Sequence, residues 1–490
     1  MSDLKIAFVT SEAVPFAKTG GLADVSRALP NYLANAGHEV KLFMPKYLQV
    51  IRGYYDLERV DGNIECRIGD KKYEGAVFRL PEGKPNLEFY FIENDFFFNR
   101  PELYRDSEAN KDYADNDERF VFFSQGVLQV LKALRWQADI IHCNDWQSAL
   151  IPVYLKSHYK DDPFFARTKS VFSIHNMGYQ GIFPPDTFKK LNVDDSLFYS
   201  TGPLEFWGDV NFMKGAIHFA DRITTVSPTY AQEIQKSEEY GNGLQDVLKE
   251  RSGKLSGILN GVDYDIWSPK TDNLIPFNYF SSNRSGKKRN KLELLNQCGL
   301  PVRMEQPLIG IISRLDAQKG FDLLEEIMNE VLAFDIQFVL LGTGDEKYHR
   351  FFSEIEKKYP DKFKAFLQFD NSLAHLIEAG ADIFLMPSRY EPCGLNQMYS
   401  LKYGTIPIVR KTGGLADTVE DFDETTGKGT GFAFEKYDSA ELLKTIKRAC
   451  ELFGRKKIWN KIVKRGMDKD YSWNRSAEKY AELYREVLSR

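Results

Sequence analysis

A seven-residue sequence that occurs twice constrains this chain more than any other feature. Lys18-Thr19-Gly20-Gly21-Leu22-Ala23-Asp24 recurs without change as residues 411–417. Each copy follows a short apolar stretch and precedes a helical pattern. Paired glycines let the backbone turn sharply and approach a ligand, and a lysine beside a helix N-terminus suits a diphosphate. One copy alone could be an ordinary strand-to-helix turn, but two copies in opposite halves favour two loops that face one cleft.

Length and composition exclude several classes of protein. A chain of 490 residues is too long for one core, so two or three domains are expected. The net charge of −5 and the pI near 6.0 give no support to a nucleic-acid or membrane partner. The five cysteines are odd in number and include no C-x-x-C, which argues against a disulfide framework and a zinc site. The first residues lead directly into a strand pattern, so no signal or transit peptide is expected and the predicted location is the cytoplasm.

Apolar patterns predict two successive α/β halves, each a doubly wound, Rossmann-like domain. In the first half the expected strands are residues 5–10, 39–44, 139–143, 170–174 and 222–226, with helices at 22–36 and 120–134 and hairpin strands within 64–98. In the second half the expected strands are residues 308–313, 337–341, 363–369, 383–386 and 406–409.

Three further segments complete the expected organisation. Residues 257–263 have the pattern of a strand and turn. Residues 269–286 are polar and without periodicity, which is typical of a connection between domains. The last segment, 471–490, is expected to be one helix that docks through its aromatic residues, Trp473, Tyr480 and Tyr484.

Two polar residues follow predicted strands in the first half, where ligands bind in doubly wound sheets. Asp145 follows the strand at 139–143 and His175 follows the strand at 170–174. A lone histidine is often a satisfied core residue, but the context His-Asn-Met-Gly-Tyr after a strand favours a functional role.

The second half offers cations and a carboxylate at its own strand ends. Arg314 and Lys319 follow the strand at 308–313, in a loop that suits phosphate oxygens or is simply solvated. Glu391 follows the strand at 383–386 and could bind sugar hydroxyls, balance positive charge or cap a helix. Cys393 could be a thiol nucleophile, although no histidine lies near it in sequence. Residues 342–344 lack the third glycine of a dinucleotide fingerprint, which argues against a nicotinamide-dependent oxidoreductase.

Taken together, these motifs resemble those of the bacterial glycogen synthases and plant starch synthases, glycosyltransferase family 5. The matching pieces spread over nearly the whole chain in the family's order. They are residues 18–24, 144–147, 175–176, 260–263, Arg314-Leu315 with Lys319-Gly320, 391–395 and 411–417.

The resemblance implies a GT-B fold of the α/β class, with two Rossmann-like doubly wound domains facing a deep interdomain cleft. It implies an N-terminal acceptor and catalytic domain at 1–256, joined by the helix at 472–490, and a nucleotide-sugar domain at 257–471. The implied activity is a retaining glycosyltransferase that moves glucose from ADP-glucose to the non-reducing end of an α-1,4-glucan, such as glycogen or a maltooligosaccharide. Neither a metal nor a cofactor is implied.

The resemblance also assigns roles to the candidate residues. Arg314 and Lys319 neutralise the diphosphate, Glu391 holds the sugar or steadies positive charge, and Asp145 and His175 line the sugar pocket. The expected substrate-binding residues are Lys18, Gly20, Gly21, Tyr113, Asn176, Cys393, Gly394, Gly413 and Gly414. Among them, Gly413 and Gly414 are expected to offer backbone N–H groups to the donor.

Two other functions stay open at this point. One is a retaining transferase of the same fold with a small acceptor, and the other is a catalytically silent glucan-binding paralogue. The presence of Arg314, Lys319 and Glu391 together weighs against the silent paralogue. Related transferases often carry a second glutamate eight positions after the first; here that position is Tyr399, a departure that the synthase family shares.

Overall fold

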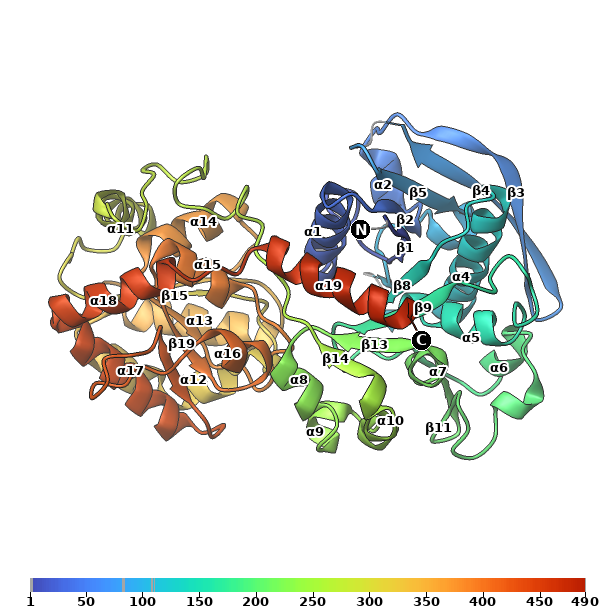
Figure 1. Cartoon of the computed structure of the whole chain (residues 1–490). Coiled ribbons are helices and arrows are strands. Elements are labelled where there is room, and N and C mark those ends of the chain that lie inside the picture. Colours follow the sequence, from blue (N-terminus) through green and yellow to red (C-terminus); the bar gives the residue numbers. More distant parts are fainter. Residues whose placement is uncertain (1–2, 82–83, 107–108, 110, 490) are drawn as a thin grey trace. The chain divides into compact units, whose positions relative to one another are not determined.

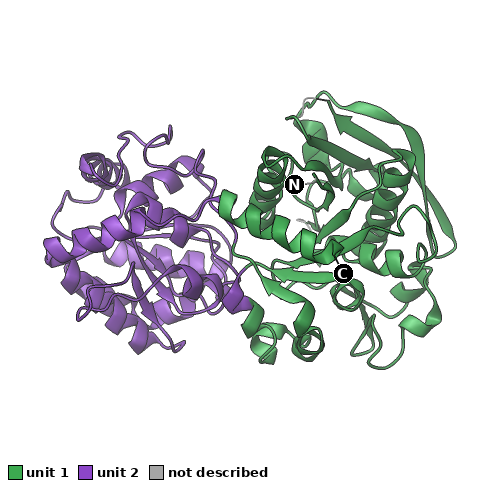
Figure 2. Cartoon of the chain, in the orientation of Figure 1, with its two compact units in different colours: residues 1–226, 231–259, 473–490 green, residues 227–230, 260–472 purple. Residues whose placement is uncertain are grey.

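The computed structural model describes the chain except residues 1–2, 82–83, 107–108, 110 and 490. The described chain forms two compact units (Figures 1 and 2). Unit 1 contains residues 1–226, 231–259 and 473–490, and unit 2 contains residues 227–230 and 260–472. The chain therefore passes between the units close to the expected boundaries at 256–257 and 471–472, and once more at residues 227–230.

Unit 1 is built on a nine-stranded sheet with the order β14-β13-β9-β8-β1-β2-β5-β4-β3. The strands from β14 to β5 run parallel, and β4 pairs antiparallel with both β5 and β3. Their bounds are β1 Lys5–Val9, β2 Glu39–Pro45, β3 Glu58–Ile68, β4 Lys71–Leu80, β5 Leu87–Glu93, β8 Ile140–Asn144, β9 Lys169–Ile174, β13 Arg222–Thr225 and β14 Leu255–Gly257. Two small antiparallel sheets contain β6 Arg105–Asp106 with β7 Lys111–Asp112, and β10 Ile182–Phe183 with β12 Asp209–Asn211 and β11 Glu205–Phe206.

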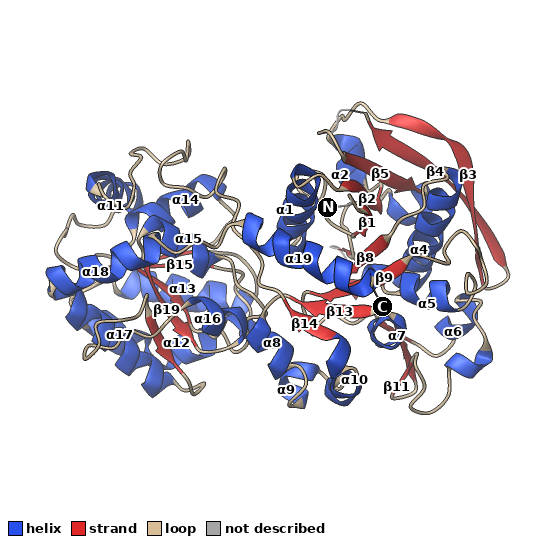
Figure 3. Cartoon of the chain, viewed as in Figure 1, coloured by secondary structure: helices blue, strands red, loops and turns tan. Residues whose placement is uncertain are grey.

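Helices pack on both faces of the unit 1 sheet (Figure 3). The helices of this unit are α1 Gly21–Asn35, α2 Leu48–Arg52, α3 Asp95–Phe98, α4 Asn116–Ala133, α5 Leu150–Lys156, α6 Thr187–Lys190, α7 Phe212–Phe219, α9 Glu238–Gly241, α10 Gln245–Glu250 and α19 Trp473–Leu488, with 3-10 turns at Trp146–Ser148, Asp195–Leu197 and Ser252–Lys254. Helix α8, Pro228–Glu233, begins among the residues of unit 2 and ends in unit 1.

Unit 2 is built on a six-stranded parallel sheet with the order β17-β16-β15-β18-β19-β20. The strands are β15 Leu308–Ile312, β16 Gln337–Leu341, β17 Phe363–Phe366, β18 Ile383–Met386, β19 Ile406–Arg410 and β20 Phe432–Phe434. The helices are α11 Ser285–Cys298, α12 Phe321–Ala333, α13 Glu346–Lys358, α14 Asn371–Gly380, α15 Asn396–Tyr403, α16 Gly413–Thr418, α17 Ser439–Gly454 and α18 Lys456–Met467, with a 3-10 turn at Ala317–Lys319.

The core of unit 2 lies on both faces of this sheet, as the unbroken apolar strands predict. Ile309 and Ile311 of β15 face a cluster formed with α12, α13, α17 and α18. Leu308 of the same strand faces a second cluster formed with α11 and α14. Because successive side chains of a strand point to opposite faces, one short strand anchors both layers and holds its carboxyl end in place.

Two sequence-based expectations about the middle of the chain are wrong. Residues 258–263 form no strand, because β14 ends at Gly257 and the chain continues as a loop. Residues 269–286 do not connect the domains, since they belong to unit 2. Asp272, in this segment, accepts hydrogen bonds from Tyr403 Oη and pairs with His375 Nδ1 at 2.7 Å. At least this one polar residue of the segment is therefore buried and bonded inside the unit.

The C-terminal helix docks as its aromatic residues predict. Trp473, Tyr480 and Tyr484 of α19 are all buried in unit 1. The Tyr484 hydroxyl lies 2.7 Å from Nδ1 of His142, which is itself buried in β8. Within the described residues, no helix is long and apolar enough to cross a membrane.

Candidate functional site

The carboxyl ends of three neighbouring strands gather polar residues in unit 1. Strands β1, β8 and β9 are adjacent in the sheet. Glu12 follows β1, Asp145 follows β8 and His175 follows β9. The two residues expected from the sequence, Asp145 and His175, are thus brought together, with Glu12 as a third member.

Asp145 has an unusual backbone and a perturbed carboxyl group. Its φ of 54° lies in the left-handed region, where residues other than glycine are uncommon. The carboxylate accepts hydrogen bonds from the backbone N–H groups of His175, at 2.7 Å, and of Asn176. Burial raises the pKa of Asp145 to about 7, and the nearby charge of Glu12 also raises it. The carboxyl group is therefore close to half-ionised at neutral pH.

His175 is a neutral imidazole whose tautomer follows from its partner. Its Nε2 lies 2.9 Å from Oδ1 of Asn144. The amide nitrogen of Asn144 donates to the Val9 carbonyl at 3.0 Å, so its oxygen faces the histidine as an acceptor. Nε2 must then carry the proton, which leaves Nδ1 as a proton acceptor. Burial lowers the pKa of His175 to about 4, so the ring carries no charge at neutral pH.

The first repeat copy is held by a carboxylate that the sequence did not single out. Glu12, which is only 4% exposed, accepts from the Thr19 N–H at 2.5 Å, the Thr19 hydroxyl at 2.6 Å and the Gly20 N–H at 3.2 Å. Tyr104 donates its hydroxyl to the same carboxylate at 2.8 Å. The Gly20 N–H is thus bonded to Glu12, and the expected substrate-binding role of Gly20 stays a prediction.

Lys18 and Gly21 stand at the edge of this loop. Nζ of Lys18 donates to both oxygens of Asp24 at 2.8 Å, and both side chains are well exposed. Gly21 begins α1, so its N–H lies in the first turn of the helix, where backbone donors are left without helical acceptors. Lys18 and Gly21 are thus the members of this copy placed to meet an anion.

Tyr113 belongs to the same neighbourhood through the backbone. Its N–H donates to the carbonyl of Tyr104, the residue that also bonds Glu12. Its ring lies 4.7 Å from the guanidinium of Arg100 and 5.0 Å from that of Arg119. Two cations therefore lie close to the ring, which restrains its orientation.

In unit 2 the predicted lysine and the predicted glutamate form one ion pair. Nζ of Lys319 lies 3.0 Å from Oε1 and 2.8 Å from Oε2 of Glu391. Ser388 donates its hydroxyl to Oε2 at 3.0 Å. The lysine side chain is 19% exposed and the glutamate side chain 8%, so the pair is largely shielded from water. The sequence assigned these residues separate roles, whereas the structure joins them in one site.

The loops that carry this ion pair are closely joined. Gly320 has a φ of 75°, and a Cβ there would lie 2.0 Å from the Pro387 carbonyl oxygen, so only glycine fits. The Arg389 N–H donates to the Gln318 carbonyl at 2.8 Å. Arg314, at the end of β15, is 54% exposed and lies 3.5 Å from Asp316. Lys319 is fixed by its loop, while the Arg314 guanidinium extends into solvent.

The second repeat copy packs on the backbone next to Glu391. A Cβ on Gly413, whose φ is 43°, would lie 2.0 Å from the Glu391 carbonyl oxygen. The Gly414 N–H donates to the carbonyls of Glu391 and Pro392, both at 3.1 Å. The Gly414 N–H, which was expected to face the donor, is therefore bonded to the backbone, and its donor-binding role stays a prediction. Gly394, with a φ of 67°, turns the chain around the Glu391 side chain.

Cys393 is a buried thiol and not a nucleophile. Its side chain is 5% exposed, and burial raises its pKa to about 12. At neutral pH the group is protonated, so the thiolate that nucleophilic attack requires is absent. Among the described residues, no group of three or more His, Cys, Asp or Glu side chains could hold a metal ion.

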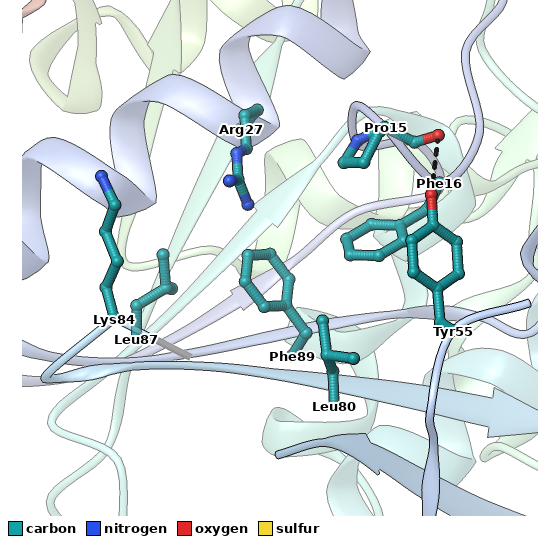
Figure 4. Close-up of a pocket in the computed structure, with 8 residues that line it drawn as sticks. All are labelled: Pro15, Phe16, Arg27, Tyr55, Leu80, Lys84, Leu87 and Phe89. Atoms are coloured by element: carbon teal, nitrogen blue, oxygen red, sulfur yellow. Dashed lines mark hydrogen bonds between the residues drawn. The ribbon is translucent and has the colours of Figure 1, made fainter. Parts of the chain in front are cut away.

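A cavity of about 160 Å³ lies beside the loop that leads to the first repeat (Figure 4). Arg27 points towards the ring of Phe89, 5.4 Å away, and the Tyr55 hydroxyl donates to the Pro15 carbonyl at 3.4 Å. The residues that line the cavity include none of the predicted site residues. The strand ends, and not this cavity, are the candidate site.

Four residues of the candidate site were missed in the sequence: Glu12, Tyr104, Asn144 and Ser388. Glu12 lies three residues after the end of β1 and Ser388 two residues after the end of β18, so the search for polar residues beyond strand ends that located Asp145 would also have located them. Asn144 ends β8 and stands beside Asp145. Tyr104 carries no sequence signal, because it lies in an irregular segment and reaches Glu12 across 92 positions of the chain.

The comparisons with known proteins agree with this architecture. Residues 5–250 match the model of the starch synthase catalytic domain, and residues 299–465 match that of glycosyl transferases group 1. The glycogen synthase of Thermotoga maritima is 47% identical over 494 residues, which cover 99% of each chain. The glycogen synthase of Koribacter versatilis is 46% identical over 98% of each chain.

Solved structures give the same result. The catalytic domain of starch synthase IV from Arabidopsis thaliana, bound to ADP and acarbose, matches with a TM-score of 0.89 and 35% identity over 100% of both chains. Sucrose-phosphate synthase from Thermosynechococcus elongatus matches with a TM-score of 0.61 at 18% identity over 99% of both chains, which shows a shared fold. This chain has the GT-B fold and belongs to the glycogen and starch synthase family of glycosyltransferases.

Proposed function

We propose that the chain transfers glucose from ADP-glucose to the non-reducing end of an α-1,4-glucan, with retention of configuration. The observation that carries this proposal is the shielded Lys319–Glu391 ion pair at the carboxyl edge of the unit 2 sheet. It places a cation and a carboxylate about 3 Å apart at this edge of the sheet. A nucleotide sugar presents the complementary charges when its glycosidic bond breaks, namely a negative diphosphate and a positive sugar ring.

Lys319 and Arg314 act on the diphosphate in this proposal. Negative charge grows on the leaving phosphate as the bond to glucose breaks, and fixed cations stabilise that charge without further reorganisation. Lys319 is already held by its loop, and the exposed Arg314 can grip phosphate oxygens at two points. These two cations carry the charge that a metal would otherwise carry, so the proposal includes no metal.

Glu391 stabilises the sugar. While Lys319 neutralises it, its carboxylate is a hydrogen-bond acceptor for glucose hydroxyls. When a diphosphate draws the Lys319 ammonium group towards itself, the negative charge of Glu391 is no longer offset and can stabilise the positive sugar ring. The ion pair thus links departure of the leaving group to stabilisation of the positive ring.

Unit 1 supplies polar groups for sugar hydroxyls. The neutral His175 has a lone pair on Nδ1 that accepts a hydrogen bond, and Asp145 accepts one when ionised and donates one when protonated. Lys18 exchanges its Asp24 partner for a phosphate oxygen. The catalytic domain of starch synthase IV was solved bound to ADP and acarbose. On that basis we propose that this chain also binds a nucleotide and a glucan. All five cysteines are free thiols, which fits the cytoplasmic location that we propose.

Incorporation of labelled glucose into glycogen tests the function. We expect the purified chain to transfer glucose from ADP-glucose faster than from UDP-glucose, and to lengthen maltooligosaccharides by single α-1,4-linked residues. Transfer only to a small acceptor would replace the proposal with the wider class of retaining transferases. Glucan binding without transfer from either donor would identify a silent paralogue.

A further inference from the structure

An exposed tryptophan stands at the tip of a two-residue hairpin in unit 1. Strands β11 and β12 pair with Phe206 opposite Asp209, so Trp207 and Gly208 form the turn. Both turn residues have positive φ, 54° for Trp207 and 92° for Gly208. The Trp207 side chain is 87% exposed. Asn-Gly is the usual sequence in such a turn, so tryptophan is an unexpected occupant.

Stability does not account for this residue. A bulky side chain at positive φ is disfavoured by its contact with the following carbonyl, and an exposed indole buries little apolar surface. Asparagine would relieve the strain at positive φ and would not expose an apolar ring. Backbone strain of this kind persists where the surroundings hold it and where it serves a function.

The surroundings hold the turn rigidly. The two oxygens of Glu205 accept from the N–H groups of Thr201, at 2.8 Å, and of Gly208, at 2.7 Å. Gly243 lies beneath the aromatic pair, since a Cβ there would come within 2.7 Å of Phe206 and 3.7 Å of Nε1 of Trp207. A rigid aromatic side chain loses little conformational entropy when a ligand covers it.

The hairpin is connected to the candidate site by packing. Trp146, next to Asp145, contacts Gly181, where a Cβ would lie 2.6 Å from its ring. It also packs on Phe183 of β10 at 5.6 Å between ring centroids, and β10 pairs with β12 of the hairpin. Tyr179, 55% exposed, lies on the same loop as His175, and its N–H donates to the Asn176 carbonyl. Packing through Trp146 and Phe183 thus joins the hairpin to the segment that carries Asp145.

We propose that the Trp207 hairpin is a glucan-binding subsite. A sugar ring of the acceptor, distant from the end that reacts, stacks on the indole and so holds the acceptor on the protein. The subsite rests on the function proposed above. A pyranose ring has an apolar C–H face and a rim of hydroxyls, and its apolar face matches the face of an exposed indole. A second contact on the same polymer raises the effective concentration of chain ends at the reaction centre.

A second copy of this chain is the competing occupant of the hairpin. A stable dimer interface buries roughly 1,200–2,000 Å² in total. One indole at a hairpin tip, bordered by the carboxylate of Glu205, supplies a small part of that area. A single sugar ring, in contrast, is the size of one indole face, so the geometry favours the glucan.

The variant Trp207→Asn tests the subsite without endangering the fold, because asparagine suits the turn. Its matched control is Tyr54→Asn, since Tyr54 is 93% exposed with a φ of 51° in the same unit but lies on the loop after α2. Retardation of each protein in a native gel that contains glycogen measures binding without turnover. We expect Trp207→Asn to weaken glycogen binding about three- to tenfold, the effect of one aromatic contact. We expect Tyr54→Asn to bind as the parent does.

A kinetic comparison separates the subsite from the reaction centre. The KM for glycogen should rise more than the KM for maltotriose, which is too short to reach both sites. Equal glycogen binding by the parent and Trp207→Asn would overturn the subsite, whether or not the enzyme transfers glucose. A change of oligomeric state in size-exclusion chromatography, at equal glycogen affinity, would assign the hairpin to self-association instead. Weaker glycogen binding by Trp207→Asn in a protein that transfers no glucose would retain the subsite and reject the proposed function.

Discussion

The two copies of the repeated heptapeptide have the same sequence and different environments. In unit 1 the N–H groups of Thr19 and Gly20 are bound by the carboxylate of Glu12. In unit 2 the N–H of Gly414 is bound by the backbone carbonyls of Glu391 and Pro392. Local sequence thus produces a strand, a turn and a helix twice, while the fold decides what the turn contacts.

The charged residues of the two copies also differ in their partners. Lys18 pairs with Asp24 inside its own copy, whereas Lys411 pairs with Glu435 outside it, at 3.0 Å. Asp417 instead accepts from the N–H and hydroxyl of Thr229, at 3.1 and 2.6 Å. Helix α1 begins at Gly21, but α16 begins at Gly413, the counterpart of Gly20. We therefore propose that in unit 2 Lys319, and not the repeat lysine, binds the phosphate.

The largest effect on activity should come from Lys319, the lysine that we propose binds phosphate in unit 2. We expect Lys319→Ala to lower kcat roughly a hundred- to a thousandfold, because it removes a charge used mainly in the transition state. Lys411→Ala, which breaks an exposed ion pair, should change kcat by less than about twofold. Initial rates with ADP-glucose and glycogen measure both variants. Equal losses in the two variants would return the phosphate role to the repeat itself.

The lysine of the first copy should have the next largest effect. Lys18→Ala removes one charged hydrogen bond to the diphosphate, worth about 1.5–3 kcal/mol, or roughly ten- to a hundredfold in kcat/KM. Lys411→Ala serves again as the control, since the two lysines occupy the same place in the same sequence. If Lys18→Ala behaves like Lys411→Ala, the first copy has no phosphate role.

Alanine substitutions of the glycines should affect the stability of the protein differently in the two copies. A Cβ on Gly414 would lie 2.0 Å from the Cys393 carbonyl oxygen, whereas a Cβ on Gly20 would meet nothing within 4 Å. We expect Gly414→Ala to lower the free energy of unfolding by about 1–3 kcal/mol, and Gly20→Ala to change it by less than about 0.5 kcal/mol. Urea unfolding followed by circular dichroism gives both values. A larger loss for Gly20→Ala would contradict the packing described for the two copies.

The smallest expected effect on activity is the influence of the Glu12 charge on the ionisation of Asp145. Glu12 carries a negative charge that the carbonyls bound to the second copy lack, and it raises the pKa of Asp145. Between pH 6 and 8 the ionised fraction of Asp145 rises through its pKa of about 7, so kcat/KM should change over that range. Glu12→Gln should move the midpoint to lower pH, and Asp145→Asn should remove the transition.

Activity is the proper readout for this pH dependence. The raised pKa of Asp145 makes the fold less stable as pH rises from 3.8 to about 7, because the folded state binds the extra proton. The lowered pKa of His175, about 4, acts in the opposite direction between pH 4 and 6.5, because there the unfolded state binds the extra proton. The two effects offset each other in stability. A midpoint that Glu12→Gln leaves unmoved would show that Glu12 has no electrostatic effect on this group.

Much of the fold was predictable because its signals are local. Apolar runs predicted most of the strands on which both units rest, although not β20, and aromatic residues in α19 predicted its burial. The family and the GT-B fold inferred from the motifs are confirmed. The error at residues 269–286 arose because a polar segment without periodicity was taken as a connection between domains, whereas it belongs to unit 2 and Asp272 anchors it there. The roles of Asp145, His175, Arg314, Lys319 and Glu391 stay predictions.

The sequence by itself determined which residues stand at strand ends, because hydrophobic pattern and glycine placement are properties of neighbouring positions. Only the tertiary structure decided what those residues contact. Lys319 meets Glu391 across 72 positions, and Tyr104 meets Glu12 across 92. Such distances depend on the strand order of each sheet, which no local pattern specifies. That is why one heptapeptide, found twice in the chain, binds a carboxylate in one unit and the backbone in the other.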